Sequence, residues 1–446
     1  MTSLVACVDF GSTFTKALLV DLDDAVVVGA ASHPSTIGTD VMDGWGACAA
    51  DLDVRDVPLL ACSSAGGGLR VAVVGNEQLV TAEAGRRVAL SSGGVVVHVA
   101  AGLDQGTVGL RQSRPDLVLL VGGTDGGNAE VLLDSARILA ADRWPTPVVV
   151  AGNTDVADDV STLLAAGAVT HQLAANVVPS IGVLAPGSAR EAIRSAFLEH
   201  VIGGKSLSAD PAFRSAVRGA TPDVVLCGVE LLGALVGDVV VVDVGGATTD
   251  VHSVVEVQAG LLDPVVGVTP VTRTVEADLG MRWSATSAYE QGVAAGLQAQ
   301  DAALAEAASR RAADPGWLPT DAAGRHDDAR LAALAVGVAL RRHAGRSRVT
   351  FGPDGRVVER TGTDLREVDL LVGSGGVLRH GDPRAALGVL RSATGDAVPG
   401  GWQLPRAPGV VVDTDYVLAA AGLLVDEHPD VARALLQRHV VARAHA

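Results

Sequence analysis

The chain has 446 residues, of which 48% are hydrophobic and 19% are charged, and its formal net charge is −17. This length predicts two or more domains with sizeable cores. The acidic balance excludes a large basic surface for nucleic acid, and no apolar run approaches the roughly 18 residues that a membrane span needs. The N-terminus has no basic region typical of a signal peptide. The four cysteines form no CxxC pair, which is typical of a reducing compartment, so we expect a cytoplasmic protein.

The chain begins with a predicted strand over residues 4–10 that bends sharply at Gly11. Strands over 17–20 and 25–30 would complete a hairpin or meander. Glycine and hydroxyl residues at a bend, with a lysine nearby, can hold a polyphosphate. The same residues also suit an ordinary solvated turn, and their spacing is not that of a Walker A loop. The residues at this bend are Asp9, Gly11, Ser12, Thr13, Thr15 and Lys16.

Short strands alternate with helices from about residue 51 to residue 205, a pattern that predicts a parallel sheet. Two glycine-rich loops, 122–128 and 152–155, directly follow predicted strands. Ligand loops of parallel sheets lie at the carboxyl ends of the strands. These two loops could bind an anion or a partner, although tight turns alone explain such glycines.

A third region begins with residues 221–237, which favour a strand and a short helix, and continues into four valines, Val239–Val242. Consecutive β-branched residues predict a strand that is buried on both faces. The next residues combine a Gly-Gly turn, two threonine hydroxyls and two carboxylates that suit magnesium or its water shell. An ordinary strand and turn is the alternative. These residues are Asp243, Gly245, Gly246, Thr248, Thr249 and Asp250.

A polar loop is predicted at residues 274–282, and its charged side chains could reach a nucleotide or magnesium, or form surface ion pairs. Alanine-rich amphipathic helices are expected at 285–312 and 327–343, followed by a hairpin that turns at 352–355. The charged residues of the polar loop are Glu276, Asp278 and Arg282.

The last glycine turn follows a predicted strand that begins at Asp369, and its glycines permit close approach of a purine ring or an α-phosphate. A strand at 410–412 then leads into a helix whose small residues, 419–422, suit tight helix packing, and a helix at 429–442 closes the chain. The residues of the turn are Gly373, Ser374, Gly375 and Gly376.

The three turns are weak signals singly, but their order along the chain resembles the actin, sugar kinase and Hsp70 ATPase superfamily. There they would be the first phosphate, second phosphate and adenosine motifs, with residues 226–236 and 413–424 as the two connecting helices. Longer stretches resemble the MutL family associated with glutamate mutase, which is unrelated to the mismatch-repair protein of that name. These stretches are Asp9–Lys16, Cys62–Arg70, Asp243–Ser253 and Glu276–Arg282.

The resemblance implies an α/β fold with a two-lobed actin- or Hsp70-like ATPase core, made of duplicated ribonuclease-H-like domains, and an inserted α/β domain. Residues 1–50 would begin the first lobe, and residues 51–205 would be the inserted domain. Residues 206–237 would return to the first lobe and form the connecting helix. Residues 238–446 would form the second lobe, with a nucleotide-binding subdomain and the C-terminal helices.

The resemblance also implies a function. The chain would be an ATP-binding and ATP-hydrolysing accessory protein, reactivating or chaperone-like, for an adenosylcobalamin-dependent mutase such as glutamate mutase or an aminomutase. Its cofactors would be ATP and Mg²⁺. Hydrolysis would let the lobes rotate about the connecting helices, and the inserted domain would meet the mutase.

The same resemblance assigns roles to single residues. Asp9 and Asp243 would hold hydrated Mg²⁺, Lys16 would offset phosphate charge, and Asp243 or Asp250 would orient or deprotonate the attacking water. The catalytic set is therefore Asp243, Asp250 and Lys16. The nucleotide would be bound by Gly11, Ser12, Thr13, Thr15, Lys16, Gly245, Gly246, Thr248, Thr249, Gly373, Ser374, Gly375 and Gly376.

Three other functions share this core. A small-molecule kinase would need a carboxylate base for its acceptor hydroxyl, and the sequence does not single one out. A nucleotide-binding assembly protein would turn ATP over negligibly. A hydantoinase or oxoprolinase subunit would need a carbonyl-activating site, for which the sequence has no candidate.

Overall fold

The computed structural model describes residues 3–65, 67–77, 80–203, 207–256, 269–352, 355–395 and 400–444. Gly66, Lys205 and the centre of the predicted hairpin turn at 353–354 lie outside them. The chain divides into two compact units: Met1–Leu226 with Asp263–Thr269, and Cys227–Leu262 with Pro270–Ala446. No helix of the described ranges has the length and hydropathy that crossing a membrane requires.

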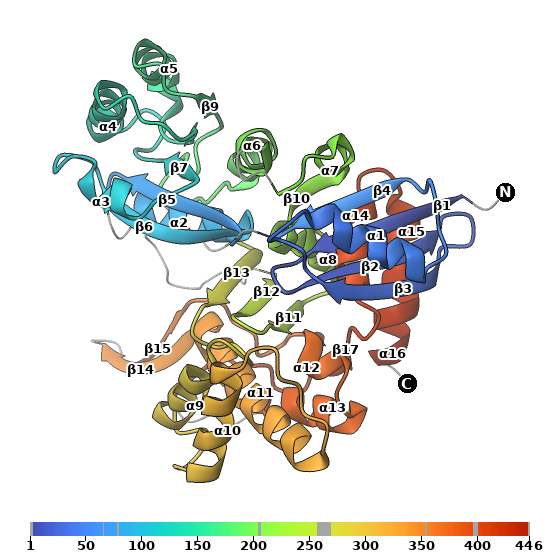
Figure 1. The fold of residues 1–446 in the computed structure, drawn as a ribbon. Coiled ribbons are helices and arrows are strands. Elements are labelled where there is room, and N and C mark those ends of the chain that lie inside the picture. The colour runs from blue at the N-terminus through green and yellow to red at the C-terminus, as the bar shows by residue number, and fades with distance from the viewer. Residues whose placement is uncertain are drawn as a thin grey trace. The chain divides into compact units, whose positions relative to one another are not determined.

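The first unit contains a five-stranded sheet with the order β10-β4-β1-β2-β3 (Figure 1). β2 is antiparallel to β1 and β3, whereas β4 is parallel to β1 and β10. Helix α1 (Val41–Asp51), which is capped by Asp40, packs on β2 and β3. The strands are β1 (Leu4–Phe10), β2 (Phe14–Asp21), β3 (Val26–Pro34), β4 (Leu59–Ser63) and β10 (Val217–Ala220).

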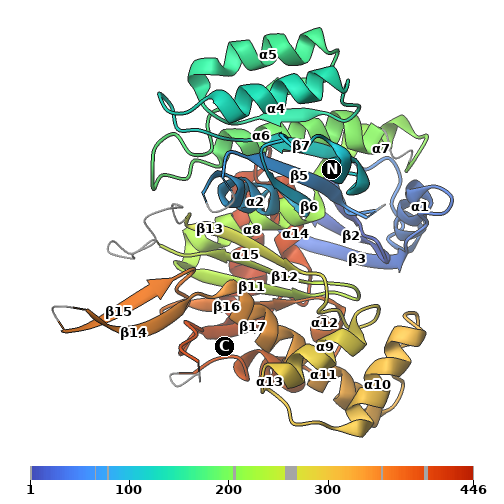
Figure 2. The ribbon, with the colours of Figure 1, turned by 90° about the vertical axis from the view of Figure 1, so that its left-hand side faces the viewer.

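A second, wholly parallel sheet of this unit has the order β6-β5-β7-β8-β9, and it confirms the predicted parallel sheet. Figure 2 shows α4 and α5 side by side along it. Its strands are β5 (Leu69–Gly75), β6 (Gly94–Ala101), β7 (Leu117–Leu120), β8 (Val148–Val150) and β9 (His171–Leu173). The helices are α2 (Thr81–Ser91), α3 (Val108–Gln112), α4 (Glu130–Ala141), α5 (Ala157–Ala166), α6 (Gly187–Ala196) and α7 (Pro211–Ala216).

The two sheets of this unit share buried core residues. Val8 and Phe10 of the first sheet belong to the same apolar cluster as Leu69 and Val71 of the second. β4, which lies within the segment 51–205, pairs with β1 in the first sheet. Deleting 51–205 would therefore open the core of the first sheet. The proposed domain boundaries stay predictions.

The predicted strand at the start of 221–237 is wrong, because one helix, α8 (Thr221–Val236), covers this segment. Its valines suggested a strand, but Pro222 in the first turn is typical of a helix start, and the preceding strand is β10. α8 crosses the division between the units, which falls after Leu226. Its Gly228 packs on the backbone of α14 (Val417–Leu424), where an added Cβ would lie 3.0 Å from the Leu418 carbonyl carbon. The expected tight packing of the small-residue helix is thus confirmed.

The second unit contains a sheet with the order β13-β12-β11-β16-β17. α11 packs on its first three strands, and the hairpin β14–β15 extends beside it (Figure 2). The strands are β11 (Val239–Val244), β12 (Thr249–Val254), β13 (Val271–Glu276), β14 (Arg346–Gly352), β15 (Gly355–Thr361), β16 (Leu370–Ser374) and β17 (Gly409–Val412). The remaining helices are α9 (Ala285–Ala294), α10 (Ala302–Ala313), α11 (Ala322–His343), α12 (Gly376–Arg379), α13 (Pro383–Arg391), α15 (Pro429–Leu436) and α16 (Ala442–Ala444).

Two predictions in this unit are corrected. The helix expected at 285–312 is two helices, because Gly296 has a φ of +69° beyond α9 and Asp301 caps α10. The loop expected at 274–282 begins as β13, since its first three residues pair with β12.

The first sheet of each unit has the same topology. Read as β3-β2-β1-β4-β10 and β13-β12-β11-β16-β17, they share two antiparallel pairs followed by two parallel pairs. The register matches as well: Asp9 pairs with Lys16 in one unit, and Asp243 pairs with Asp250 in the other. The structure therefore confirms an α/β fold with duplicated ribonuclease-H-like sheets and one additional α/β sheet.

Candidate nucleotide site

The first predicted phosphate turn is the tip of the hairpin β1–β2. The Gly11 N–H donates to the Phe14 carbonyl at 3.1 Å, and a side chain at Gly11 would press on that oxygen. Ser12 and Thr13 are exposed at the tip. Ser35, just after β3, supports the turn from one side: its hydroxyl donates to the Gly11 carbonyl at 2.6 Å and its N–H to the Thr13 carbonyl at 2.9 Å.

The charged residues of this turn lie beside each other. Lys16 Nζ is 3.5 Å from Asp9 Oδ2, and Thr221 at the start of α8 donates its hydroxyl to Asp9 Oδ1 at 2.6 Å. Asp9 is buried, whereas the Lys16 side chain is 30% exposed. Thr15, predicted to contact the nucleotide, is only 1% exposed and lies against Gly44 of α1. Its hydroxyl faces that helix and not the tip of the turn.

The second predicted phosphate turn has the same closing hydrogen bond. The Gly245 N–H donates to the Thr248 carbonyl at 2.9 Å. A five-residue segment, Gly280–Ser284, which we call the brace, lies under this turn. The Met281 N–H donates to the Gly245 carbonyl at 2.9 Å, and the Arg282 N–H donates to the Gly246 carbonyl at 2.7 Å.

The brace also holds a third carbonyl, because the Ser284 hydroxyl donates to Ala247 at 2.8 Å. In a planar trans peptide the C=O and the following N–H point in opposite directions. The N–H groups of Gly246, Ala247 and Thr248 therefore point away from the brace, and none of them donates to another of the described residues. Successive N–H groups that point to one side form an anion-binding concavity.

The side chains of the second turn divide between its surface and its interior. The Thr248 hydroxyl donates to Asp250 Oδ2 at 3.2 Å, and Asp250 Oδ1 accepts from Arg273 Nε at 3.0 Å. Arg273 lies on β13 and is 3% exposed. The Thr249 hydroxyl, predicted to reach the nucleotide, is buried and donates to the Leu279 carbonyl.

The third predicted turn lies beside the second within the same unit. Ser374 pairs with Asp243 in the register of β16 and β11. Gly375 has a φ of +95°, and an added Cβ would lie 2.7 Å from the Val244 carbonyl carbon. A Cβ at Gly373 would instead press on Leu390 of α13, so this glycine serves helix packing. Gly376 is exposed with open space around it, whereas Ser374 and Gly375 are buried, so Gly376 is the accessible part of this turn.

Each unit supplies one carboxylate next to a phosphate turn, Asp9 and Asp243. Within the described ranges, no group of three His, Cys, Asp or Glu side chains is arranged to hold a metal ion. Mg²⁺ in nucleotide sites is typically held by one or two carboxylates together with phosphate oxygens and water. The half-buried Asp243, beside the outward N–H groups, fits such a site, and so does Asp9 with its oxygens between Lys16 and Thr221.

The charged side chains of the predicted polar loop form ion pairs with other residues of the second unit. Glu276 and Asp278 bind Arg342 of α11 at 2.7 and 2.6 Å. Burial raises the pKa of Glu276, whereas the hydrogen bond from Arg342 lowers the pKa of Asp278. The Arg282 guanidinium points to Asp328.

Sequence reasoning missed the residues that support the turns: Ser35, Thr221, Arg273 and the brace. Gly280 was the available signal, because a glycine can mark a site where another backbone approaches closely. A Cβ there would lie 2.5 Å from the Ala247 carbonyl oxygen and 2.6 Å from that of Gly246.

The glycine-rich loops of the parallel sheet are tied to one another. Asp125 accepts from the Thr154 N–H at 3.0 Å and from Asn176 Nδ2 at 2.8 Å, and Asp155 accepts from the Gly126 N–H at 2.9 Å. These bonds explain their polar residues as loop structure. A role in binding stays a prediction.

Comparisons with known proteins give two kinds of likeness. A family model described as MutL protein matches residues 5–440, and "Protein MutL" of Clostridium tetanomorphum is 33% identical over 461 residues, covering 97% of this chain and 98% of that protein. Among solved structures, nucleotide-free acetone carboxylase has 15% identity and a TM-score of 0.38, covering 87% of this chain and 68% of its own. The ATP-dependent caprolactamase of Pseudomonas jessenii has 13% identity and a TM-score of 0.39, with coverages of 94% and 70%. Xylulose kinase of Bifidobacterium adolescentis has 13% identity and a TM-score of 0.27, with coverages of 94% and 99%.

Proposed function

The chain belongs to the MutL protein family, and we propose that it is an ATP-hydrolysing accessory protein for an adenosylcobalamin-dependent mutase. The observation that carries ATP binding is the second turn, where three consecutive carbonyls are held from one side and three N–H groups point to the other. Such a turn binds an anion through its backbone.

In this proposal the phosphates are bound by the turns at Gly11–Thr13 and Gly245–Thr248, and the adenosine by the exposed Gly376, which the buried Gly375 positions. The exposed hydroxyls of Ser12 and Thr13 and the Lys16 ammonium add donors and positive charge. Thr15, Thr249, Gly373 and Ser374 would support the site from inside the fold, because they are buried.

For hydrolysis we assign Asp243 as the carboxylate that orients the attacking water and Asp250 as its companion. When bound, Mg²⁺ would neutralise charge on the phosphate oxygens, with Asp243 and Asp9 as its protein ligands. Asp250 is bound to Arg273, which makes it the weaker candidate for accepting a proton. Catalysis would then rest on positioning and electrostatic stabilisation.

The test of this site is Asp243→Ala. The variant should lose Mg²⁺-dependent phosphate release by at least about a hundredfold, as expected when a group that stabilises the transition state is removed, and should keep wild-type circular dichroism. Asp369→Ala is a control in the same sheet, remote in register from the turn, because Asp369 bonds the Asp238 N–H at the opposite end of β11. Unchanged phosphate release in Asp243→Ala would refute the assignment.

The partner is tested separately. Phosphate release should rise when a purified adenosylcobalamin-dependent mutase is added, and the mutase should be retained on the immobilised protein. Consumption of a sugar, a hydantoin or oxoproline in step with ATP would instead support a kinase or hydrolase. Binding of ATP with negligible turnover, alone or with the mutase, would support an assembly protein.

A further inference from the structure

Arg282 joins the second phosphate turn to two helices. Its backbone N–H donates to the Gly246 carbonyl at 2.7 Å, as part of the brace. Its side chain runs away from the turn: Nη2 lies 3.0 Å from Asp328 Oδ2, and Nη1 donates to the Met281 carbonyl at 2.7 Å. The Gly246 carbonyl also accepts the Trp283 N–H at 3.0 Å, so the Arg282 side chain helps to fix one of the two donors that hold it.

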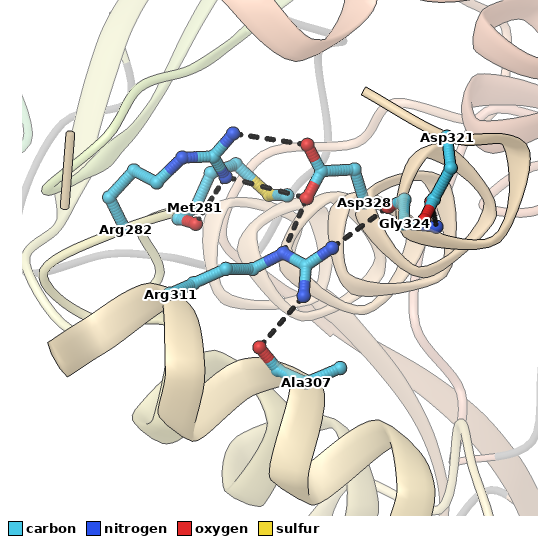
Figure 3. Close-up of polar contacts among 7 residues, drawn as sticks. All are labelled: Met281, Arg282, Ala307, Arg311, Asp321, Gly324 and Asp328. Atoms are coloured by element: carbon cyan, nitrogen blue, oxygen red, sulfur yellow. Dashed lines mark hydrogen bonds and ion pairs between the residues drawn. The ribbon is translucent and has the colours of Figure 1, made fainter. Parts of the chain in front are cut away.

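Asp328 lies on α11 and binds a second arginine from α10 (Figure 3). Arg311 Nε donates to Asp328 Oδ1 at 2.5 Å, and its other nitrogens donate to the Ala307 carbonyl at 2.7 Å and the Gly324 carbonyl at 2.8 Å. Arg311 is 1% exposed and stacks over Trp317 at 5.1 Å. The chain of contacts therefore ends on the backbone of both helices.

This network has two guanidinium groups for one carboxylate, and all three side chains are at least mostly buried. Removing one partner of a buried ion pair is costly, because the remaining charge loses its compensation. If Asp328 lost its charge, Arg282 would lose its anchor and would move toward water. The backbone N–H of Arg282 would then lose its fixed position under Gly246.

We propose that Asp328 is a positioning residue for the second phosphate turn, acting through Arg282 and held in place by Arg311. It would keep the Gly246 carbonyl turned to the brace, so that the Ala247 N–H stays directed at the phosphates. This inference rests on the proposed function, since the ligand it concerns is ATP. It also makes the α10–α11 helices the part of the second unit that responds when phosphates occupy the turn.

The experiment measures ATP and adenosine binding by calorimetry in the presence of Mg²⁺. Asp328→Asn should bind MgATP about tenfold more weakly, while adenosine, which lacks phosphates, should bind both proteins equally. The matched control is Arg330→Gln, which removes another ion pair between α11 and α10, the 2.6 Å contact with Asp301. That control should bind both ligands as the wild type does, because it has no contact with the brace.

If Asp328 had only a structural role, Asp328→Asn would weaken the binding of both ligands or of neither. Either result would overturn the inference. If Asp328→Asn fails to fold, Arg282→Met gives the same test, since it removes the guanidinium that binds Asp328 while residue 282 still has a backbone N–H. Equal MgATP affinity in Arg282→Met would also overturn it. Absence of ATP binding in the wild type would instead refute the proposed function.

Hydrogen exchange supplies a second readout. MgATP should slow exchange at the start of α11, near Gly324, in the wild type and in Arg330→Gln, but adenosine should not. Asp328→Asn should lose this protection, because the link between the turn and the helices is broken. Protection that persists in Asp328→Asn would contradict the proposed route.

Discussion

The two phosphate turns use one backbone design with different surroundings. Gly11 and Gly245 close the turns with equivalent hydrogen bonds, and the residues two positions before them are carboxylates in both. Thr15 and Thr249, at equivalent register, are 1% and 0% exposed. The shared residues are therefore those that form the bend and anchor it in the fold.

The differences lie in charge and in support. In the first hairpin, Lys16 lies opposite Asp9. In the second, Asp250 lies opposite Asp243 and binds Arg273. The carbonyls of the first turn accept hydrogen bonds from Ser35, and Thr221 binds Asp9 beside it, whereas the carbonyls of the second turn accept from the brace. The two copies of the sheet therefore share the geometry of the turn but differ in the charged residues beside it and in the hydrogen bonds that support it. We expect the second turn to be the more sensitive to mutation.

The largest expected loss of stability follows from replacing Asp250, the residue opposite Asp243. Asp250→Ala removes a carboxylate from Arg273, which is 3% exposed, and breaking a buried pair typically costs about 3 kcal/mol or more. Lys16→Met removes a longer contact of 3.5 Å made by a side chain that is 30% exposed, and the buried Asp9 keeps the hydrogen bond from the Thr221 hydroxyl, so the loss of stability should be smaller.

Urea unfolding of the two variants checks this comparison. The unfolding midpoint of Asp250→Ala should lie at a clearly lower urea concentration than that of the wild type. The midpoint of Lys16→Met should lie close to that of the wild type. Lys16→Met should still weaken ATP binding, because the ammonium would contact phosphate. Equal loss of stability in both variants would remove the asymmetry between the turns.

The next largest effect is expected when the brace is displaced from the second turn. Gly280→Ala places a Cβ 2.5 Å from the Ala247 carbonyl oxygen, so the turn or the brace must move, at a cost of about 2 kcal/mol for such overpacking. MgATP binding should weaken by more than about tenfold. Gly46→Ala is the control beside the first turn: Gly46 lies on the exposed side of α1 with no atom within 4 Å, and the change should leave ATP binding unaltered. Wild-type affinity in Gly280→Ala would argue against the brace.

Some of these features could be predicted from the sequence, and others could not. Strand–glycine turns at Gly11, Gly245 and Gly375 were predictable, because turn geometry depends on neighbouring residues. The parallel sheet was predictable from alternating strands and helices. The brace was not, because Gly280 meets Gly246 only after β13 and the following segment have folded back across 34 residues.

Burial explains most of the remaining errors. Thr15 and Thr249 were predicted to contact nucleotide because hydroxyls at a turn suit phosphates, but alternate strand residues face opposite sides, and these two face the core. α8 was predicted in part as a strand, because a buried helix with consecutive valines has no amphipathic pattern. For Arg282 the sequence left a ligand contact and an ion pair both open, and it did not identify the ion-pair partner, because Asp328 is 46 residues away.

A third prediction uses pH. His252 lies on β12, where the equivalent residue of β2 is Leu18, and His343 of α11 is hydrogen-bonded to Ser253 of β12. Burial lowers the pKa of His343 to about 4, and burial with Arg273 lowers that of His252 well below its usual range. Between pH 4 and 6.5 the unfolded chain binds more protons than the native state, so stability falls as pH drops. His343 alone should remove about 2 kcal/mol between pH 7 and pH 5.

Hydrogen exchange of β12 and β2, corrected for intrinsic rates, checks this difference. Protection of β12 should fall between pH 7 and pH 5, and protection of β2 should fall less. His343→Gln should flatten the change in β12, although it also alters the hydrogen bonds to Ser253 and Thr274. An unchanged pH response in this variant would assign the effect to other groups.

The smallest expected effect is at Ser35, the support of the first turn. Ser35→Ala removes the hydroxyl that donates to the Gly11 carbonyl but keeps the N–H that donates to Thr13. One lost hydrogen bond is worth about 1 kcal/mol, and the remaining bond keeps the turn in place. MgATP affinity should therefore fall by no more than about fivefold.

The matched variant of the second turn is Ser284→Ala, which removes the hydroxyl from the Ala247 carbonyl and leaves the brace bonds of Met281, Arg282 and Trp283 intact. If the second turn is the more sensitive of the two, Ser284→Ala will weaken MgATP binding more than Ser35→Ala does. The reverse order would mean that the number of supporting hydrogen bonds, and not the stiffness of the second turn, limits phosphate binding.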